Sequence, residues 1–187
     1  MLRLNRYAII TVGKTHSGKS TFAEELHPHL SNSHIIDQDN HATFINTYYK
    51  DMLPEEGPNV LKYVVSQSIL DYALDYTHAH LILSNANLSR VGRSKLLDQF
   101  RQRGIKTILV YFDLPNQVLE ERIEQTNRST DIFRVATTFE EVLERQSVTE
   151  QEEDLLPPTQ SETDHLFVIK GAKDTHTVIS DICNIAE

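Results

Sequence analysis

The sequence predicts an α/β fold in which five parallel strands form a sheet with helices on both faces. Five short runs of almost continuously apolar residues alternate with longer segments of helical periodicity along the 187 residues. Apolar runs of this kind are typical of strands that are buried on both faces of a parallel sheet. Polar clusters follow four of the runs directly, and ligands bind at that end of the strands in such sheets. Because no repeat or linker is apparent, residues 1–187 are expected to form one domain.

The strands are predicted from apolar or β-branched residues that end at polar or turn-forming residues. The segment from Thr107 to Phe112 is the clearest example, because it is β-branched and apolar throughout. The segment from Leu81 to Leu83 is only a triplet, and it ends at the polar residues 84–87. We expect strands at 8–12, 33–37, 81–83, 107–112 and 166–169.

Helical periodicity and capping signals predict the helices between these strands. Apolar residues recur at helical spacing from Asn59 to Tyr76. Ser89 can cap a helix that Gly104 ends, and Pro115 suits an early helical position. We expect helices from the end of the first turn to residue 26, and at 41–50, 59–76, 89–103, 115–124, 139–149 and 177–186, and surface loops at 54–58 and 150–163.

The first strand leads into a nine-residue turn that fits the P-loop pattern G-x-x-x-x-G-K-[ST]. Gly13 and Gly18 lack a Cβ, so the backbone can curl and direct several N–H groups at one point. These groups and the positive end of the next helix form an anion site the size of a phosphate. Lys19 is predicted to reach the β- and γ-phosphates, and the Ser20 hydroxyl to hold Mg²⁺. The residues expected to bind the phosphates of a nucleoside triphosphate are Gly13, Lys14, Thr15, His16, Ser17, Gly18, Lys19, Ser20 and Thr21.

Two carboxylates, Asp37 and Asp39, follow the second predicted strand. Phosphoryl transfer needs a group that orients or deprotonates the acceptor, and a carboxylate one strand away from the γ-phosphate can do so. We favour Asp39 for this catalytic role, because Asp37 still belongs to the strand end and can support Mg²⁺ through water. The alternative is that the pair only forms a turn and caps the next helix.

Three arginines, Arg122, Arg128 and Arg134, lie in or beside the polar segment 125–138. Guanidinium groups bridge phosphate oxygens and neutralise the charge that develops during phosphoryl transfer. A polar loop between two helices can close over a nucleotide as a lid, so residues 125–138 are the expected lid. The alternative is a solvated helix face on which the arginines pair with neighbouring glutamates.

Composition narrows the class of partner and the expected compartment. The formal net charge is −9, which disfavours long nucleic acids as partners but allows a local basic pocket for a small anion. The single cysteine, Cys183, cannot form an internal disulfide and fits a reducing compartment. No apolar run approaches the length of a membrane span. We therefore expect a cytoplasmic protein without a membrane partner.

Beyond the P-loop, three segments resemble the P-loop kinases of the nucleotide and nucleoside kinase-like group, and most of all the polynucleotide kinase and zeta-toxin branch. The segment 35–39 (IIDQD) resembles the acidic motif that carries the acceptor-orienting Asp. The segment 84–89 (SNANLS), with the arginines that follow it, resembles a D-x-N-L element. The segment 110–115 (VYFDLP), followed by Arg122 and Arg128, resembles the fourth strand and the arginine-bearing lid.

This resemblance covers about residues 6–150 and implies a P-loop NTPase fold with strand order 2-3-1-4-5. It implies ATP or GTP as the donor, a small-molecule or 5′-hydroxyl as the acceptor, and contact between the loop 171–173 and the base. The sequence departs from the pattern at Asn85, where the family has an Asp. Since an amide does not hold Mg²⁺ as a carboxylate does, either Asp37 takes over that role or the activity is weak.

The leading hypothesis is an ATP-dependent kinase in which Lys19, Asp39, Arg122 and Arg128 are catalytic and Ser20 and Asp37 serve the metal. The alternatives are a nucleotide-binding switch protein with little turnover and a toxin-like kinase acting on a sugar nucleotide. The acceptor is expected beside residues 41–76, where aromatic side chains can stack on a ring. Core packing explains these aromatic residues equally well. The candidates there are His41, Phe44, Tyr48 and Tyr49.

Overall fold

The computed structural model describes residues 5–133, 135–148 and 153–186. Arg134, one of the three arginines considered for the lid, lies outside these residues. Within the described residues, no helix is both long and apolar enough to span a bilayer.

Five parallel strands form one sheet in the order β2-β3-β1-β4-β5, which confirms the predicted fold class and strand order. The central strand β1 pairs with β3 on one side, where Ile9 is opposite Ile82, and with β4 on the other, where Ile9 is opposite Ile108. Each predicted strand is present within one residue of its expected limits. The strands are β1 (Tyr7–Val12), β2 (Ser33–Ile36), β3 (His80–Leu83), β4 (Lys106–Phe112) and β5 (His165–Ile169).

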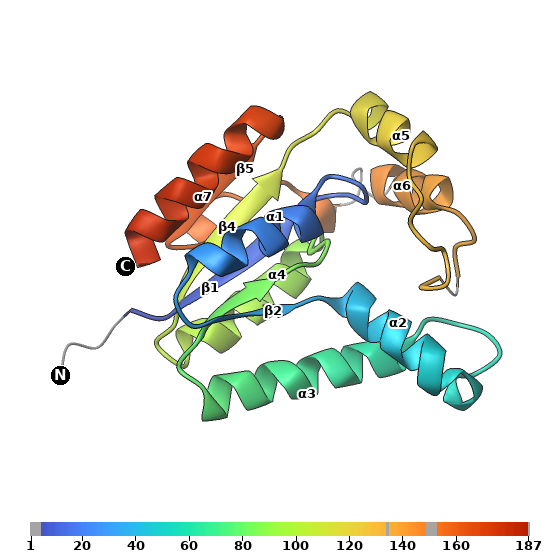
Figure 1. The fold of residues 1–187 in the computed structure, drawn as a ribbon, viewed down its shortest axis with the longest axis horizontal. Coiled ribbons are helices and arrows are strands. Elements are labelled where there is room, and N and C mark those ends of the chain that lie inside the picture. Colours follow the sequence, from blue (N-terminus) through green and yellow to red (C-terminus); the bar gives the residue numbers. More distant parts are fainter. Residues whose placement is uncertain (1–4, 134, 149–152, 187) are drawn as a thin grey trace.

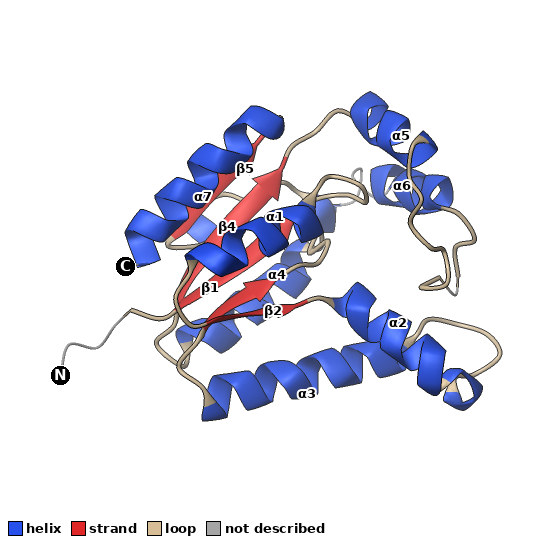
Figure 2. Ribbon diagram, viewed as in Figure 1, coloured by secondary structure: helices blue, strands red, loops and turns tan. Residues whose placement is uncertain are grey.

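Helices cover both faces of the sheet (Figure 1). Because side chains alternate along a strand, Ile9 of β1 packs on one face with α1 and α7, while Ile10 packs on the other with α3 and α4. Figure 2 shows the sheet between these two helical layers. The helices are α1 (Lys19–Leu26), α2 (Gln38–Tyr48), α3 (Val60–Tyr76), α4 (Arg90–Arg101), α5 (Asn116–Glu124), α6 (Phe139–Val148) and α7 (Ala172–Ala186).

Three helices lie beyond the carboxyl ends of the strands (Figure 1). Helices α5 and α6 pack together through a small core of their own, which includes Leu119, Ile123 and Phe139. Helix α2 lies on the other side of the same sheet edge, and a bond of 2.7 Å between His41 Nδ1 and Ser66 Oγ joins it to α3. The described residues of the predicted lid, 125–133 and 135–138, lie between α5 and α6 in the sequence and face α2.

Two helices begin earlier than their periodicity predicts, because acidic side chains cap them. Asp37 caps α2 by accepting a hydrogen bond from the backbone N–H of Asp39, so this helix begins at Gln38. The Asp174 carboxylate accepts from the backbone N–H groups of Lys170 and Gly171, and α7 begins at Ala172. These caps satisfy N–H groups that a helix start leaves unpaired. The predicted loop 150–163 contains two short 3-10 turns, η4 (Glu153–Leu155) and η5 (Gln160–Glu162).

His80 makes the stability of this sheet depend on pH. Its Nδ1 accepts a hydrogen bond of 3.2 Å from the Tyr7 backbone N–H, and its ring stacks on the Tyr7 ring at 5.9 Å. Burial, and then the nearby Arg6 guanidinium, lower the pKa of His80 below its usual value. The unfolded chain therefore takes up a proton at a higher pH than the folded protein does, and folding loses stability as the pH falls below about 6.5.

We expect His80→Gln to lose part of this dependence, since a glutamine carbonyl can accept the same N–H but does not titrate. Thermal unfolding measured between pH 7.5 and pH 5.5 tests this expectation. The midpoint should fall less in the variant than in the wild type, and an equal fall in both would contradict the role of His80.

Candidate functional site

The shape of the turn between β1 and α1 depends on its two glycines. A Cβ at Gly13 would lie 2.9 Å from Phe112 Cβ and 3.0 Å from Ser17 Oγ, so no larger residue fits. Gly18 has φ +101°, a conformation that side chains rarely allow, and directly precedes α1. The start of α1 therefore faces the inside of the loop, where its N–H groups and dipole favour an anion.

Lys19 is the partly buried cation of this loop. Its Nζ donates to the Lys14 carbonyl at 2.5 Å and to Ser17 Oγ at 3.2 Å. The pKa of Lys19 is lowered to about 8, mainly by burial and also by the Arg128 guanidinium, against the opposing effects of the Asp39 and Asp37 carboxylates. A bound phosphate would favour the charged ammonium, so this side chain is suited to an anionic ligand.

Three oxygens gather at the end of the loop. Ser20 Oγ donates to Asp37 Oδ2 at 3.0 Å and accepts from Ser84 Oγ at 3.3 Å. Hydroxyl and carboxylate oxygens are the ligands that Mg²⁺ prefers, either directly or through water, so this donor set fits the ion. Asn85 is engaged elsewhere, because its Oδ1 accepts the Gln38 backbone N–H at 3.0 Å. Of Asp37 and Asn85, it is therefore Asp37 that contacts Ser20.

Asp39 and Arg128 form an ion pair across the site. Arg128 Nη2 lies 2.6 Å from Asp39 Oδ2, and both side chains are about 40% exposed, at 38% and 41%. The Arg128 guanidinium also lies over the Phe139 ring of α6, 5.4 Å from its centroid. A second bond, from Asn46 of α2 to the Asp131 carbonyl, joins the same two segments. The segment 125–138 thus contacts α2 at two points.

Arg122 lies against the opposite side of the loop. Its Nη1 donates to the His16 carbonyl at 3.0 Å and is 3.7 Å from where a Cβ on Gly18 would be. The His16 ring packs edge-on against Phe139 at 4.5 Å. Burial, followed by the cations around it, lowers the pKa of His16, so this ring is neutral near pH 7.

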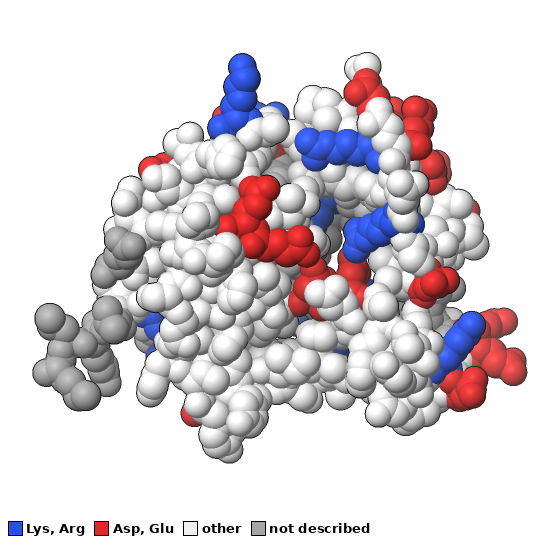
Figure 3. Space-filling view, viewed as in Figure 1, with Lys and Arg blue, Asp and Glu red and all other residues white. Residues whose placement is uncertain are grey.

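These side chains line one cleft of about 700 Å³ at the carboxyl end of the sheet. Figure 3 shows basic and acidic side chains together at the mouth of this hollow. Among the described residues, the cleft has more cations than anions, although the whole chain has a net charge of −9. A small anion is therefore favoured here despite the acidic surface. The charged lining residues are Lys19, Lys62, Arg122, Arg128 and Arg145 against Glu24, Asp37 and Asp39.

Comparison with known families identifies this arrangement. A family model described as an AAA domain (AAA_33) matches residues 9–149, which include the phosphate loop and Asp37, Asp39, Arg122 and Arg128. The chain belongs to this AAA domain family. Its fold is that of the kinase-like P-loop proteins, as the resemblance of the sequence implied.

Solved structures that share this fold include nucleotide complexes and kinases. Kti12 from Chaetomium thermophilum in complex with ADP-AlF3 is 16% identical at a TM-score of 0.63, covering 96% of this chain and 99% of that chain. A sugar kinase from Janibacter sp. HTCC2649 is also 16% identical, at a TM-score of 0.59 over 96% and 93% of the two chains. The Mycobacterium tuberculosis APS kinase CysC in complex with AMPPNP and APS is 17% identical, at a TM-score of 0.55 over 94% and 97%. The comparison with curated proteins gives no significant match.

In this AAA domain, the predicted site residues lie together, but the aromatic residues considered for the acceptor do not join them. Phe44 contacts Tyr48 and Tyr49 at centroid distances of 5.3 and 5.6 Å, and all three are exposed. Neither they nor His41 belong to the described lining of the cleft. Their helical spacing is explained by contact with one another along α2 and its end.

The cleft also contains residues that the sequence reading missed. Lys62 and Tyr63 come from the first turn of α3, and Arg145 and Gln146 from the last turns of α6. Gln146 Oε1 accepts the Thr15 backbone N–H at 2.7 Å. No motif surrounds these residues in the sequence. Only the position of the first turn of α3 and the last turns of α6 at the carboxyl edge of the sheet could have singled them out.

A second cavity of about 390 Å³ lies on the other side of the phosphate loop, where Arg122 also lines it. Gly18 and Thr21 border it from the loop side, and Gly171 and Ala172 border it from the start of α7. The loop predicted to contact the base therefore adjoins the phosphate site.

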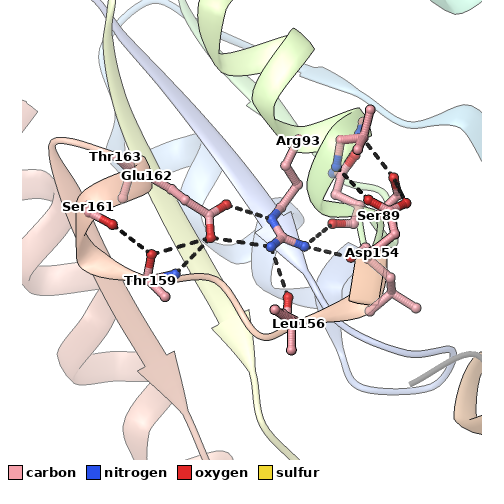
Figure 4. A network of polar contacts seen from close by, with 12 residues as sticks. Ser89, Arg93, Asp154, Leu156, Thr159, Ser161, Glu162 and Thr163 are labelled. Carbon is pink, nitrogen blue, oxygen red and sulfur yellow. Dashed lines mark hydrogen bonds and ion pairs between the residues drawn. The ribbon is translucent and has the colours of Figure 1, made fainter. Parts of the chain in front are cut away.

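A buried arginine outside the cleft holds the backbone on which the phosphate loop rests (Figure 4). Arg93 of α4 is 2% exposed and donates to the Asn87 and Leu88 carbonyls at 3.2 and 2.6 Å. It also binds the Leu156 carbonyl at 2.9 Å and the Glu162 carboxylate at 3.1 Å, which ties residues 153–163 to α4. Arg93 is one of the arginines that follow the segment resembling a D-x-N-L element, and in the structure it supports the backbone of that segment.

The same backbone contacts the first glycine of the loop. The Gly13 N–H donates to the Ala86 carbonyl at 2.9 Å, and Asn87 Nδ2 donates to the Thr11 carbonyl at 2.9 Å. The Asp154 carboxylate accepts from Ser89 Oγ and from the Val91 N–H at 2.6 and 2.8 Å. Residues 153–163 therefore support the phosphate loop through the segment 84–91.

We expect Glu162→Ala to lower the free energy of unfolding by about 3 kcal/mol, because it leaves the Arg93 guanidinium buried without its counter-ion. Urea denaturation measures this loss. Glu162→Gln is the matched control, since it keeps an acceptor oxygen and should lose less. An Ala variant within about 0.5 kcal/mol of the wild type would show that the pair does not hold this region.

Proposed function

We propose that this protein is a kinase that transfers the γ-phosphoryl group of ATP or GTP to a hydroxyl group of a small molecule or nucleotide. The observation that carries this proposal is the position of Asp39 and Arg128. A carboxylate and a guanidinium are in contact at 2.6 Å in the cleft that also contains Lys19. Transfer to a hydroxyl needs both groups beside the phosphate loop, one for the acceptor and one for the phosphate.

The phosphate side of the reaction uses the loop 13–21. The N–H groups of the loop and the Lys19 ammonium bind the β- and γ-phosphates. Ser20, with Asp37 beside it, holds Mg²⁺, which when bound neutralises charge on the phosphate oxygens. The second cavity, between Thr21 and the start of α7, has room for the base of the nucleotide, with Arg122 between base and phosphates.

On the acceptor side, Asp39 orients the hydroxyl and accepts its proton as the phosphoryl group is transferred. Arg128 and Arg122 bind the oxygens of the transferring group, where charge accumulates. In the ion pair between Asp39 and Arg128 the two groups neutralise each other. A third phosphate near Lys19 competes with Asp39 for Arg128, so nucleotide binding itself frees the carboxylate for the acceptor. The segment 125–138 closes over the nucleotide as this happens.

The acceptor is a small molecule rather than a polymer. A cleft of about 700 Å³ accommodates a triphosphate and one compact acceptor. The net charge of −9 opposes the approach of a long polyanion. Lys62 and Tyr63 line the α3 side of the cleft and are our candidates for contact with the acceptor.

One observation favours a second candidate, a nucleotide-binding switch protein with little turnover. Asn85 Oδ1 is engaged by the Gln38 N–H, so the segment after β3 adds no carboxylate to the metal site. A metal site with Asp37 as its single acidic side chain holds Mg²⁺ less firmly than one with two. The switch reading therefore predicts tight nucleotide binding without acceptor-dependent turnover.

We expect Lys19→Ala to weaken ATP binding by tenfold or more, because it removes the cation of the phosphate loop. Asp39→Asn should leave ATP binding intact or strengthen it, because Arg128 no longer pairs with a carboxylate, but it should lower acceptor-stimulated ADP release by about 10²-fold or more. Titration calorimetry and a coupled ADP assay with a panel of hydroxylated metabolites measure the two effects.

Asp75→Asn is the matched control, since it makes the same chemical change on the exposed surface of α3 and should leave both quantities unchanged. Nucleotide binding with no response to any acceptor would support the switch reading. Full activity in Asp39→Asn would exclude Asp39 as the acceptor-orienting group.

A further inference from the structure

Gln146 makes a contact with the phosphate loop that neither the P-loop pattern nor the family match explains. This half-buried residue lies in the last turn of α6, and its Oε1 accepts the Thr15 backbone N–H at 2.7 Å. Thr15 is the third residue of the loop and is 9% exposed. Both residues line the main cleft, together with Lys19.

This contact is one of several that join the tip of the loop to the helices on either side of the segment 125–138. Arg122 of α5 donates to the His16 carbonyl at 3.0 Å, and Lys14 Nζ donates to Asn116 Oδ1, also of α5, at 2.8 Å. From α6, Gln146 accepts the Thr15 N–H and Phe139 packs against the His16 ring. The loop tip at 14–16 is therefore held from both helices.

The amide of Gln146 can form more hydrogen bonds than its contact with Thr15 uses. A glutamine side chain carries one acceptor oxygen and a nitrogen with two donor hydrogens. The oxygen is used by the Thr15 N–H, while the structure gives Nε2 no hydrogen-bond partner among the described residues. A neutral donor in the cleft that Lys19 and Arg122 also line can bind a phosphate oxygen without adding charge.

We propose that Gln146 binds the third phosphate of the nucleotide and thereby makes the site distinguish a nucleoside triphosphate from a diphosphate. The proposal rests on the proposed function, since it requires that the loop bind a nucleotide. With a triphosphate present, the Nε2 group of Gln146 donates to the terminal phosphate while Oε1 keeps or exchanges its bond to Thr15. With a diphosphate, the amide has only the Thr15 contact. Because α6 follows the segment 125–138, the additional contact of Gln146 with a triphosphate also makes the position of that segment depend on the bound nucleotide.

Gln146→Glu is the sharpest test of this role. A carboxylate still accepts the Thr15 N–H, so the loop and its contact with α6 are kept. The same carboxylate cannot donate, and it places a negative charge beside the terminal phosphate. We expect its ATP affinity to fall by about tenfold or more, and its ADP affinity to change by less than about threefold. Gln146→Ala, which removes the donor without adding a charge, should lose ATP affinity by a smaller factor and keep ADP affinity.

Titration calorimetry with ATP and with ADP, each in the presence of Mg²⁺, gives the ratio of the two affinities. Gln102→Glu is the matched control, because it makes the same exchange at an exposed position at the end of α4 and should leave the ratio unchanged. A structural role for Gln146 would alter ATP and ADP binding by the same factor. An equal change in both, or no change in either, would overturn the assignment of Gln146 while leaving the proposed function intact. A wild-type protein that binds neither nucleotide would instead overturn the proposed function.

Discussion

The placement of the curled backbone at 13–18 is the constraint on which the rest of the structure depends. A turn that directs its N–H groups inward leaves few of them to bond with one another, so other elements must hold it. The hydrogen bond from the Gly13 N–H to the Ala86 carbonyl fixes where the loop begins. Phe112 Cβ lies so close to Gly13 that β4 limits the loop from the other side. The cradle is therefore shaped by β4 and by the segment that follows β3, and not by its own residues alone.

The supports of this loop reach across the whole chain. Arg93 connects residues 153–163 to the segment that carries Ala86, and the helices α5 and α6 hold residues 14–16. A buried, fully paired guanidinium is costly to leave without its partner, so this connection is rigid. The ion pair of Asp39 with Arg128 is half exposed by comparison, and water competes for both groups. A site that is covered by a closing segment needs a rigidly supported phosphate loop and weaker contacts between that segment and the rest of the site.

The sequence predicted the framework well because the framework is encoded locally. Apolar runs, caps such as Ser89 and the glycine pattern of the loop each act over a few residues, and the strands and the fold class followed from them. The strand order followed from the resemblance to the P-loop kinases. Contacts between distant segments could not be read in the same way. The hydrogen bond from the Thr15 N–H to Gln146 Oε1 joins residues 131 positions apart, and no motif near Gln146 in the sequence predicts it. The aromatic residues of α2 and its end do show a local pattern, but their helical spacing is compatible with both a binding face and a cluster. In the structure they form a cluster outside the cleft.

The fate of the terminal phosphate of ATP tests the proposed chemistry most directly. The protein is incubated with Mg²⁺, a mixture of small hydroxylated metabolites and ATP labelled in its γ-phosphate, and the labelled products are separated. The proposal predicts that the label appears in a phosphate ester of one of the alcohols with the wild type, and that this product is lost when Asp39 is changed to Asn. Label that appears in inorganic phosphate alone, equally with both proteins, would contradict a kinase that uses Asp39.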